Sequence, residues 1–253
     1  MAPDGFSRQM LTFNGQYPGP TIEANWGDEV IVHIKNTLQN NGYSSTTTWC
    51  LTDRTAIHWH GILQEHNVAN DGVPGVSQCP IPPGEWFTYR FRATSYGQSW
   101  YHSHFSLQYT DGLVGPIVVY GPSSANWDVD LGPVSLTDWF HTSAFQEYFI
   151  QLQFGNPPVG GDNGLINGKN MFNGSGEYSE FKFEKGKRYR MRLINTATNT
   201  HFKFWIDQHV MTVQGADFVA IQPYQTEVLN IAIGTPNLLP HADAKRTTIR
   251  YHI

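Results

Sequence analysis

The chain has 253 residues, of which 14% are aromatic and 15% charged, and its 16 basic and 21 acidic side chains give a net charge of -5. A chain of this length can bury a sizeable core, which excludes the small disulfide-stapled scaffolds. No Lys/Arg run could follow a phosphate backbone, no apolar run approaches the roughly 20 residues of a membrane span, and the first ten residues lack the pattern of an export signal. We therefore expect no nucleic-acid partner and no membrane insertion.

Two segments repeat one pattern, which consists of a turn, an alternating strand and then Asn-Thr. They begin at Gly27 and Gly186, much farther apart than the about 20 to 50 residues of a solenoid repeat. Apolar side chains at every second place predict strands that bury one face. These side chains are Val30, Val32 and Ile34 in the first copy and Tyr189, Met191 and Leu193 in the second. The repeat predicts two similar β-domains in tandem.

Between the two copies, further strand-like runs occur at roughly 56–64, 86–93, 98–105 and 114–120, separated by turns rich in glycine and proline. Many short strands at such spacing are typical of an antiparallel sandwich or a Greek-key barrel. The breaker-rich stretch GPSSAN at 121–126 indicates a boundary. We therefore expect an all-β fold with a first domain at 1–122, a partial second domain at 123–234 and an atypical tail at 235–253.

One helix is expected near the start of the second domain. Thr142 and Ser143 are candidate caps, and Gly155 would end the helix. Its apolar residues at helical spacing predict a stripe that packs against a sheet. They are Phe145, Tyr148, Phe149 and Leu152.

Four of the 11 histidines stand out, as two His-x-His pairs in strand-like runs: His58 with His60, and His102 with His104. Alternation along a strand turns both imidazoles of a pair to the same face. One isolated pair would be explained by a polar strand face. Two pairs in one copy of the repeat favour metal ligation, because clustered imidazoles are costly to bury unless a metal binds them.

The kind of metal follows less directly from the residues. Imidazoles without neighbouring carboxylates disfavour magnesium and calcium and suit copper, zinc, nickel or iron, with copper favoured by the general order of affinities. The second copy reads Thr200-His201-Phe202 in the corresponding region, so the metal chemistry belongs to the first. Asp71, in Asn70-Asp71-Gly72, is either a turn-forming aspartate or a carboxylate that delivers protons near a metal.

Cys50 and Cys79 are too few for a zinc module, and they could form a disulfide with each other or remain separate. Asn173-Gly174-Ser175 is a glycosylation sequon and a weak indication of secretion.

Several motifs together resemble one known family. They are NGQYPGP at 14–20, HWHG at 58–61, DGVPGVSQCPI at 71–81, WYHSHF at 100–105 and DNGLING at 162–168. Over roughly residues 3–234 the chain resembles a fungal laccase of the multicopper oxidase family, of the ascomycete type. The resemblance implies cupredoxin-like domains, copper cofactors, secretion, and one-electron oxidation of phenolic small molecules coupled to the reduction of dioxygen to water.

The resemblance also implies roles for individual residues. His58 matches a type 2 copper ligand, whereas His60, His102 and His104 match type 3 ligands of a trinuclear copper cluster. Asp71 matches an acidic residue with a role in proton delivery beside that cluster.

The chain departs from the family pattern in ways that affect the expected activity. The third cupredoxin domain of the family, with the type 1 copper site and the other half of the cluster ligands, is not in this sequence, and the family places the partner of Cys79 there. About eleven residues at roughly 44–54 look like an insertion, and Asn199 occupies a position where the family often has an acidic residue that contacts the phenol. We expect this chain alone to be inactive.

Two alternatives to the oxidase remain. The chain could be a truncated copper-binding β-module without oxidase activity, with an incomplete second domain. It could also be a β-sandwich binding protein whose surface aromatics bind a carbohydrate or a lignin-like ligand.

Overall fold

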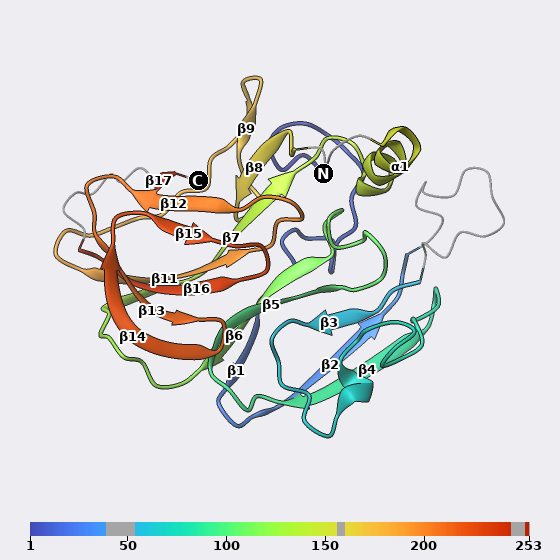
Figure 1. The fold of residues 1–253 in the computed structure, drawn as a ribbon, viewed down its shortest axis with the longest axis horizontal. Coiled ribbons are helices and arrows are strands. Elements are labelled where there is room, and N and C mark those ends of the chain that lie inside the picture. Colours follow the sequence, from blue (N-terminus) through green and yellow to red (C-terminus); the bar gives the residue numbers. More distant parts are fainter. Residues whose placement is uncertain (39–53, 156–159, 244–250, 253) are drawn as a thin grey trace.

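The computed structural model describes residues 1–38, 54–155, 160–243 and 251–252, and within them strands predominate (Figure 1). The first half of the chain forms a four-stranded sheet in the order β1-β6-β5-β3 and a two-stranded sheet of β2 and β4. The bounds of these strands are β1 (Ile22–Asn25), β2 (Glu29–Lys35), β3 (Ile57–Trp59), β4 (Trp86–Arg92), β5 (Gly97–Ser103) and β6 (Val114–Tyr120). The short 3-10 helix η1 (Val68–Asn70) lies between β3 and β4.

An apolar core joins the two sheets of the first half. Trp59 of β3 and Tyr101 of β5 contribute from one sheet, and Tyr89 and Phe91 of β4 contribute from the other. The rings of Trp59 and Tyr89 are 5.1 Å apart, edge to face, which is a favourable arrangement for two buried aromatics. The first half is thus a β-sandwich, as the strand spacing predicts.

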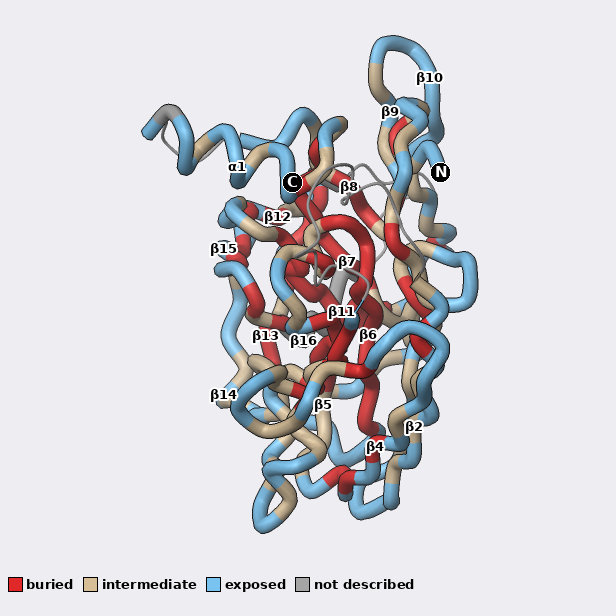
Figure 2. The backbone as a smooth tube through the Cα atoms, turned by 90° about the vertical axis from the view of Figure 1, so that its right-hand side faces the viewer, coloured by how far each residue is buried: buried red, intermediate tan, exposed pale blue. Residues whose placement is uncertain are grey.

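The second half is a larger sandwich, with a six-stranded sheet in the order β14-β13-β16-β11-β7-β8 and a three-stranded sheet in the order β15-β12-β17. A small hairpin of β9 (Met171–Phe172) and β10 (Ser175–Gly176) projects beyond it (Figure 2). The other bounds are β7 (Val129–Trp139), β8 (Asn163–Ile166), β11 (Arg188–Asn195), β12 (Phe202–Ile206), β13 (Met211–Ala216), β14 (Val219–Thr226), β15 (Leu229–Ile231), β16 (Pro236–Asp243) and β17 (Tyr251–His252). Its core includes Leu193, Phe204 and Ile231, all fully buried.

The segment expected to be an atypical tail contributes strands to this second sandwich. The backbone of β16 pairs with β11 on one side and β13 on the other, so the sheet continues past residue 234. Likewise, β17 pairs with β12. The end of the family-like sequence therefore does not coincide with the end of the sheet.

The single predicted helix forms, but its apolar stripe does not pack as expected. Helix α1 (Ala144–Phe154) is capped by Ser143, whose side chain accepts from the backbone N–H of Gln146, and it ends at Gly155 in the left-handed conformation. Phe149 and Leu152 are 57% and 66% exposed. The prediction that the stripe packs on a sheet is wrong, because α1 projects from one end of the molecule (Figure 2).

At eleven residues, α1 cannot span a bilayer, and the described ranges hold no helix that combines the length and apolarity of a membrane span.

The two halves meet along β5 and β6. Ile194 of β11 packs with Trp100 of β5 and Val114 of β6 in a small buried cluster. From the turn between β13 and β14, Phe218 packs against the core of the first half. The ends of β3 and β5 are thereby brought against the second half.

Candidate metal centre

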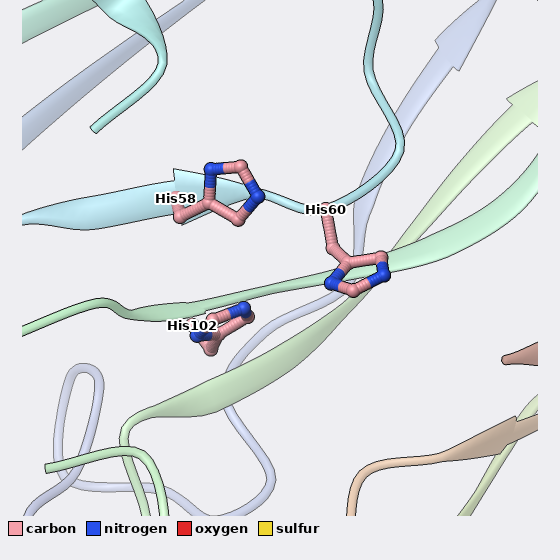
Figure 3. Close-up of side chains that lie close together, drawn as sticks. All are labelled: His58, His60 and His102. Atoms are coloured by element: carbon pink, nitrogen blue, oxygen red, sulfur yellow. The ribbon is translucent and has the colours of Figure 1, made fainter. Parts of the chain in front are cut away.

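The two His-x-His pairs come together because β3 and β5 are antiparallel neighbours, with His58 directly opposite His102. Their ring centroids are 5.4 Å apart. The ring of His60 lies 5.9 Å from each of these two rings. His58, His60 and His102 each offer one nitrogen, and these three atoms lie within 4.8 Å of one another (Figure 3).

His104 lies beside this group, with its ring centroid 5.4 Å from that of His58 and 5.9 Å from that of His102. The structure thus brings all four predicted histidines to one place. The strands are shorter than expected, however, because β3 ends at Trp59 and β5 ends at Ser103. His60 and His104 therefore follow the strand ends, where the backbone turns.

The residue between the two histidines of each pair faces the opposite way, as strand alternation requires. Trp59 is fully buried in the core of the first half. Ser103 is also fully buried, and its hydroxyl donates to Oε1 of Gln108 at 2.7 Å. These two anchored side chains fix the strands, so the imidazoles project from a rigid support.

Hydrogen bonds to carbonyl groups determine which nitrogen carries the proton in two of the rings. Nδ1 of His58 bonds the carbonyl oxygen of Asp71 at 2.7 Å, and Nδ1 of His102 bonds that of Ser103 at 2.9 Å. A carbonyl oxygen can only accept, so each Nδ1 must donate. In the neutral form of each ring the lone pair is then on Nε2, which is the arrangement of metal-ligating histidines with an oriented ring.

Burial keeps two of the rings neutral. The pKa of His102 is lowered to about 3, chiefly because the ring is buried and further because of the charges that His58, His60 and His104 would carry; its bond to Ser103 opposes this shift. Burial also lowers the pKa of His60, with smaller effects of His58 and His104. Neutral imidazoles are the form that binds metals, so the donor set fits a transition metal such as copper.

The side chain of Asp71 lies next to His58, on the side of the ring that carries Nδ1. The carboxylate Oδ1 is 3.4 Å from that nitrogen, and the side chain is 28% exposed. The contact depends on Gly72, which has a φ of +82° and sits so close to β3 that an added Cβ would lie 1.8 Å from the carbonyl oxygen of Ile57. Sequence reasoning missed the role of Gly72, although the Asp-Gly pair in a turn is a signal for it.

Trp100 is a second residue whose role the sequence did not reveal. Its ring is stacked on His102 at 4.2 Å and on His60 at 5.1 Å, with an interplanar angle of 26° in each case. Trp100 and His102 are two positions apart on β5, so they share one face. An aromatic residue two places before a candidate ligand in the same strand is the signal that could have identified it.

Other predicted features lie elsewhere or outside the described residues. Asn199 follows β11, and its backbone N–H donates to Asp138. Cys79 is exposed and forms no disulfide with another described residue, whereas Cys50 and most of the expected insertion fall within residues 39–53, outside the described residues. A pairing of the two cysteines is therefore not tested.

Comparisons with known proteins agree with this architecture. Two family models described as multicopper oxidase match residues 1–124 and 130–238. The chain is 52% identical over 245 residues to oxidoreductase OpS5 of Beauveria bassiana, covering 92% of this chain and 39% of that protein. It is 47% identical over 244 residues to laccase-2 of Botryotinia fuckeliana, covering 92% of this chain and 40% of that protein.

Among solved structures, the crystal structure of the laccase from Botrytis aclada superposes with a TM-score of 0.87 at 45% identity, covering 95% of this chain and 44% of that one. Fet3p, a multicopper oxidase that functions in iron import, superposes with a TM-score of 0.80 at 30% identity, covering 94% of this chain and 42% of that one. The chain therefore spans well under two thirds of the length of these relatives.

Proposed function

Because this chain belongs to the multicopper oxidase family, we propose that it is the part of a laccase-type oxidase that carries four of the histidine ligands of the copper cluster. In that role it supplies His58, His60, His102 and His104 to a cluster of type 2 and type 3 copper ions, and the whole protein oxidises phenolic small molecules by one electron while reducing dioxygen to water. The observation that carries the proposal is the group of three histidine nitrogens within 4.8 Å of one another. A third cupredoxin domain would be the partner that completes the ligand set.

In this proposal the chain's own residues orient the histidine rings and supply protons. The orientation comes from two backbone carbonyl groups. Carbonyl groups of Asp71 and Ser103 hold the protons of His58 and His102 on Nδ1, so each Nε2 faces the site as an acceptor. Copper, when bound there, would supply one-electron redox chemistry to dioxygen. A neutral ring that is already oriented binds a metal without the cost of deprotonation or of ordering the side chain.

Proton supply is the proposed task of Asp71. The reduction of dioxygen to water consumes protons as well as electrons, so a carboxylate near the site and in contact with solvent can act as a relay. Asp71 meets both conditions, because Oδ1 is 3.4 Å from Nδ1 of His58 and the side chain is 28% exposed.

We further propose that the protein is secreted and glycosylated at Asn173. Asn173 is exposed between β9 and β10, so its side chain is accessible to a glycosylating enzyme. Mass spectrometry of protein secreted by a fungal host checks this, and an unmodified Asn173 would contradict it.

The test of the main proposal measures copper bound per chain together with oxygen uptake on a phenol. We expect copper binding that His102→Ala abolishes and that the matched change His201→Ala, in the second half, leaves intact. Oxygen uptake that a chelator and His102→Ala both abolish supports an oxidase. If a preparation that contains the third domain binds copper but takes up no oxygen, the alternative is favoured, namely a copper-binding β-module without oxidase activity. If no copper binds, both the oxidase and the copper-binding module are refuted.

A further inference from the structure

The outer edge of the His60 ring lies against the second half of the chain, at the turn before β16. A Cβ added to Gly234 would lie 3.4 Å from Cε1 of His60 and 3.7 Å from its Nε2. Figure 3 shows one nitrogen of His60 pointing toward His58 and His102 and the other pointing away. Since Nε2 faces Gly234, the nitrogen that His60 turns to the other rings is Nδ1.

The same ring is held on one face by Trp100, at 5.1 Å between centroids. Trp100 is itself supported from the second half, because it packs on Ile194 of β11. The added Cβ of Gly234 would also lie 3.9 Å from Cζ2 of Trp100. Trp100 and Gly234 therefore enclose His60 from two directions.

The backbone of Gly234 has little freedom to move away from His60. Its N–H donates to the carbonyl oxygen of Asn195 at 3.0 Å, and the N–H of Thr235 donates to that of Ala232 at 3.2 Å. Asn195 is fully buried, and its side-chain amide bonds the carbonyl oxygen of Ile231 at 2.9 Å. The turn is thus tied to the end of β11, which is itself bonded to β15.

We propose that Gly234 is a positioning residue of the metal centre, through which the second half of the chain sets the orientation of His60. The inference rests on the proposed function, because it needs a metal to bind at the three rings. A methyl at position 234 would just touch the ring, whereas the branched side chain of valine would occupy the space of Cε1 and Nε2. The ring would then have to turn, and Nδ1 would leave its place opposite His58 and His102.

A matched glycine separates this contact from backbone strain. Gly132 has a φ of +75° and Gly234 one of +73°, and an added Cβ at Gly132 would have no atom within 4 Å. Substitutions at these two positions carry the same penalty for a left-handed residue. They differ in what the new side chain meets.

The experiment titrates the full chain and the variants Gly234→Ala, Gly234→Val, Gly132→Ala and Gly132→Val with Co²⁺ alone, followed by visible absorption, and with Cu²⁺ alone, followed by electron paramagnetic resonance. We expect Gly234→Val to bind about tenfold or more weakly than Gly132→Val, as for other changes around metal ligands. We also expect an altered spectrum for Gly234→Val and a smaller change for Gly234→Ala. Thermal unfolding without metal checks that each variant is folded.

Equal affinities and identical spectra for the Gly234 and Gly132 variants would overturn this inference and leave the proposed function standing. If the unsubstituted chain shows no metal binding that His58→Ala removes, both fail. Should Gly234→Val not fold, Gly234→Ala decides, because a spectrum identical to that of Gly132→Ala would also overturn the inference.

Discussion

The two halves of the chain build sandwiches from the same kind of strand, but they use the strand ends differently. In the first half, the ends of β3 and β5 carry four imidazoles that lie side by side. In the second half, β12 begins with Phe202 and also contains Phe204, and both side chains are buried in the apolar core. A sandwich can therefore be kept while its chemistry changes, because strand interiors maintain the core and strand ends are free to hold ligands.

The repeated strand shows a second contrast. Residues alternate between exposed and half-buried along β2, whereas every residue of β11 after the first is buried. The difference follows from position, since β2 pairs with β4 in a two-stranded sheet and β11 lies between β7 and β16.

The largest effect is expected from truncating the equivalent apolar residues of the two repeated strands. Leu193 of β11 is fully buried, so Leu193→Ala should lower the free energy of unfolding by about 3 to 4 kcal/mol through lost contacts and a cavity. Ile34 of β2 is only half-buried, and Ile34→Ala should cost about 1 kcal/mol. Urea unfolding of both variants measures these two losses of unfolding free energy. Equal losses would show that the deeper burial of β11 does not make it contribute more to stability than β2.

A second test compares two glycines in the loop that carries Asp71. Both have a left-handed φ, +82° at Gly72 and +78° at Gly75, but only Gly72 lies against β3; an added Cβ at Gly75 would have open space. Gly75→Ala should cost about 1 kcal/mol of backbone strain. Gly72→Ala should cost roughly 2 kcal/mol more, because the loop must move off the carbonyl of Ile57.

The Gly72 and Gly75 variants can also be compared by their affinity for Cu²⁺ at the candidate metal centre. Moving the loop would break the bond from His58 to the carbonyl of Asp71, so Gly72→Ala should weaken Cu²⁺ binding about tenfold or more. Gly75→Ala serves as the control and should bind as the unsubstituted chain does. Unchanged affinity in Gly72→Ala would mean that this carbonyl does not orient His58.

Much of this architecture could be predicted from residue patterns. The alternation in β2 and the spacing of β4, β5 and β6 predicted their strands, and Ser143 and Gly155 predicted both ends of α1. The histidine pairs predicted a common site because alternation fixes the side of a strand to which a residue turns. Whether the two strands would be neighbours was not determined by these local patterns, because pairing across 40 residues or so depends on the whole sheet.

The contacts that Gly72 and Gly234 make could not be predicted for a related reason. Each glycine lies against a residue far away in the sequence, and a glycine by itself signals a turn but not what lies beside it. The exposed stripe of α1 was mistaken for a packed one because helical periodicity shows that a face is apolar, not that another element covers it.

A third test concerns the charge that ties the N-terminal segment to the second half. Asp4 is fully buried and accepts from Nε2 of His141 at 2.8 Å. Burial by itself would raise the pKa of Asp4, but hydrogen bonds from His141, Asn163 and the backbone N–H of Phe6 outweigh it, and the pKa lies below the usual 3.8. Stability from the ionised carboxylate is therefore present above pH 3.8 and lost as the pH falls through the lower value in the folded state.

Asp4→Asn should therefore lower the free energy of unfolding. This loss should be larger above pH 3.8, where the carboxylate is ionised, than below it. Urea unfolding at a series of pH values measures the difference, and the effect should be smaller than that of a core truncation. A difference independent of pH would show that hydrogen bonding, without the charge, ties the N-terminal segment in place.

The smallest effect is expected at α1. Leu152 is 66% exposed, whereas Phe204 in the core of the second half is fully buried. Leu152→Ala should therefore change the free energy of unfolding by less than about 0.5 kcal/mol, the usual range for surface changes, while Phe204→Ala should cost about 3 kcal/mol or more. A loss of more than about 1 kcal/mol in Leu152→Ala would mean that the helix face is covered in solution, for example by a second copy of the chain, and that loss would then depend on protein concentration.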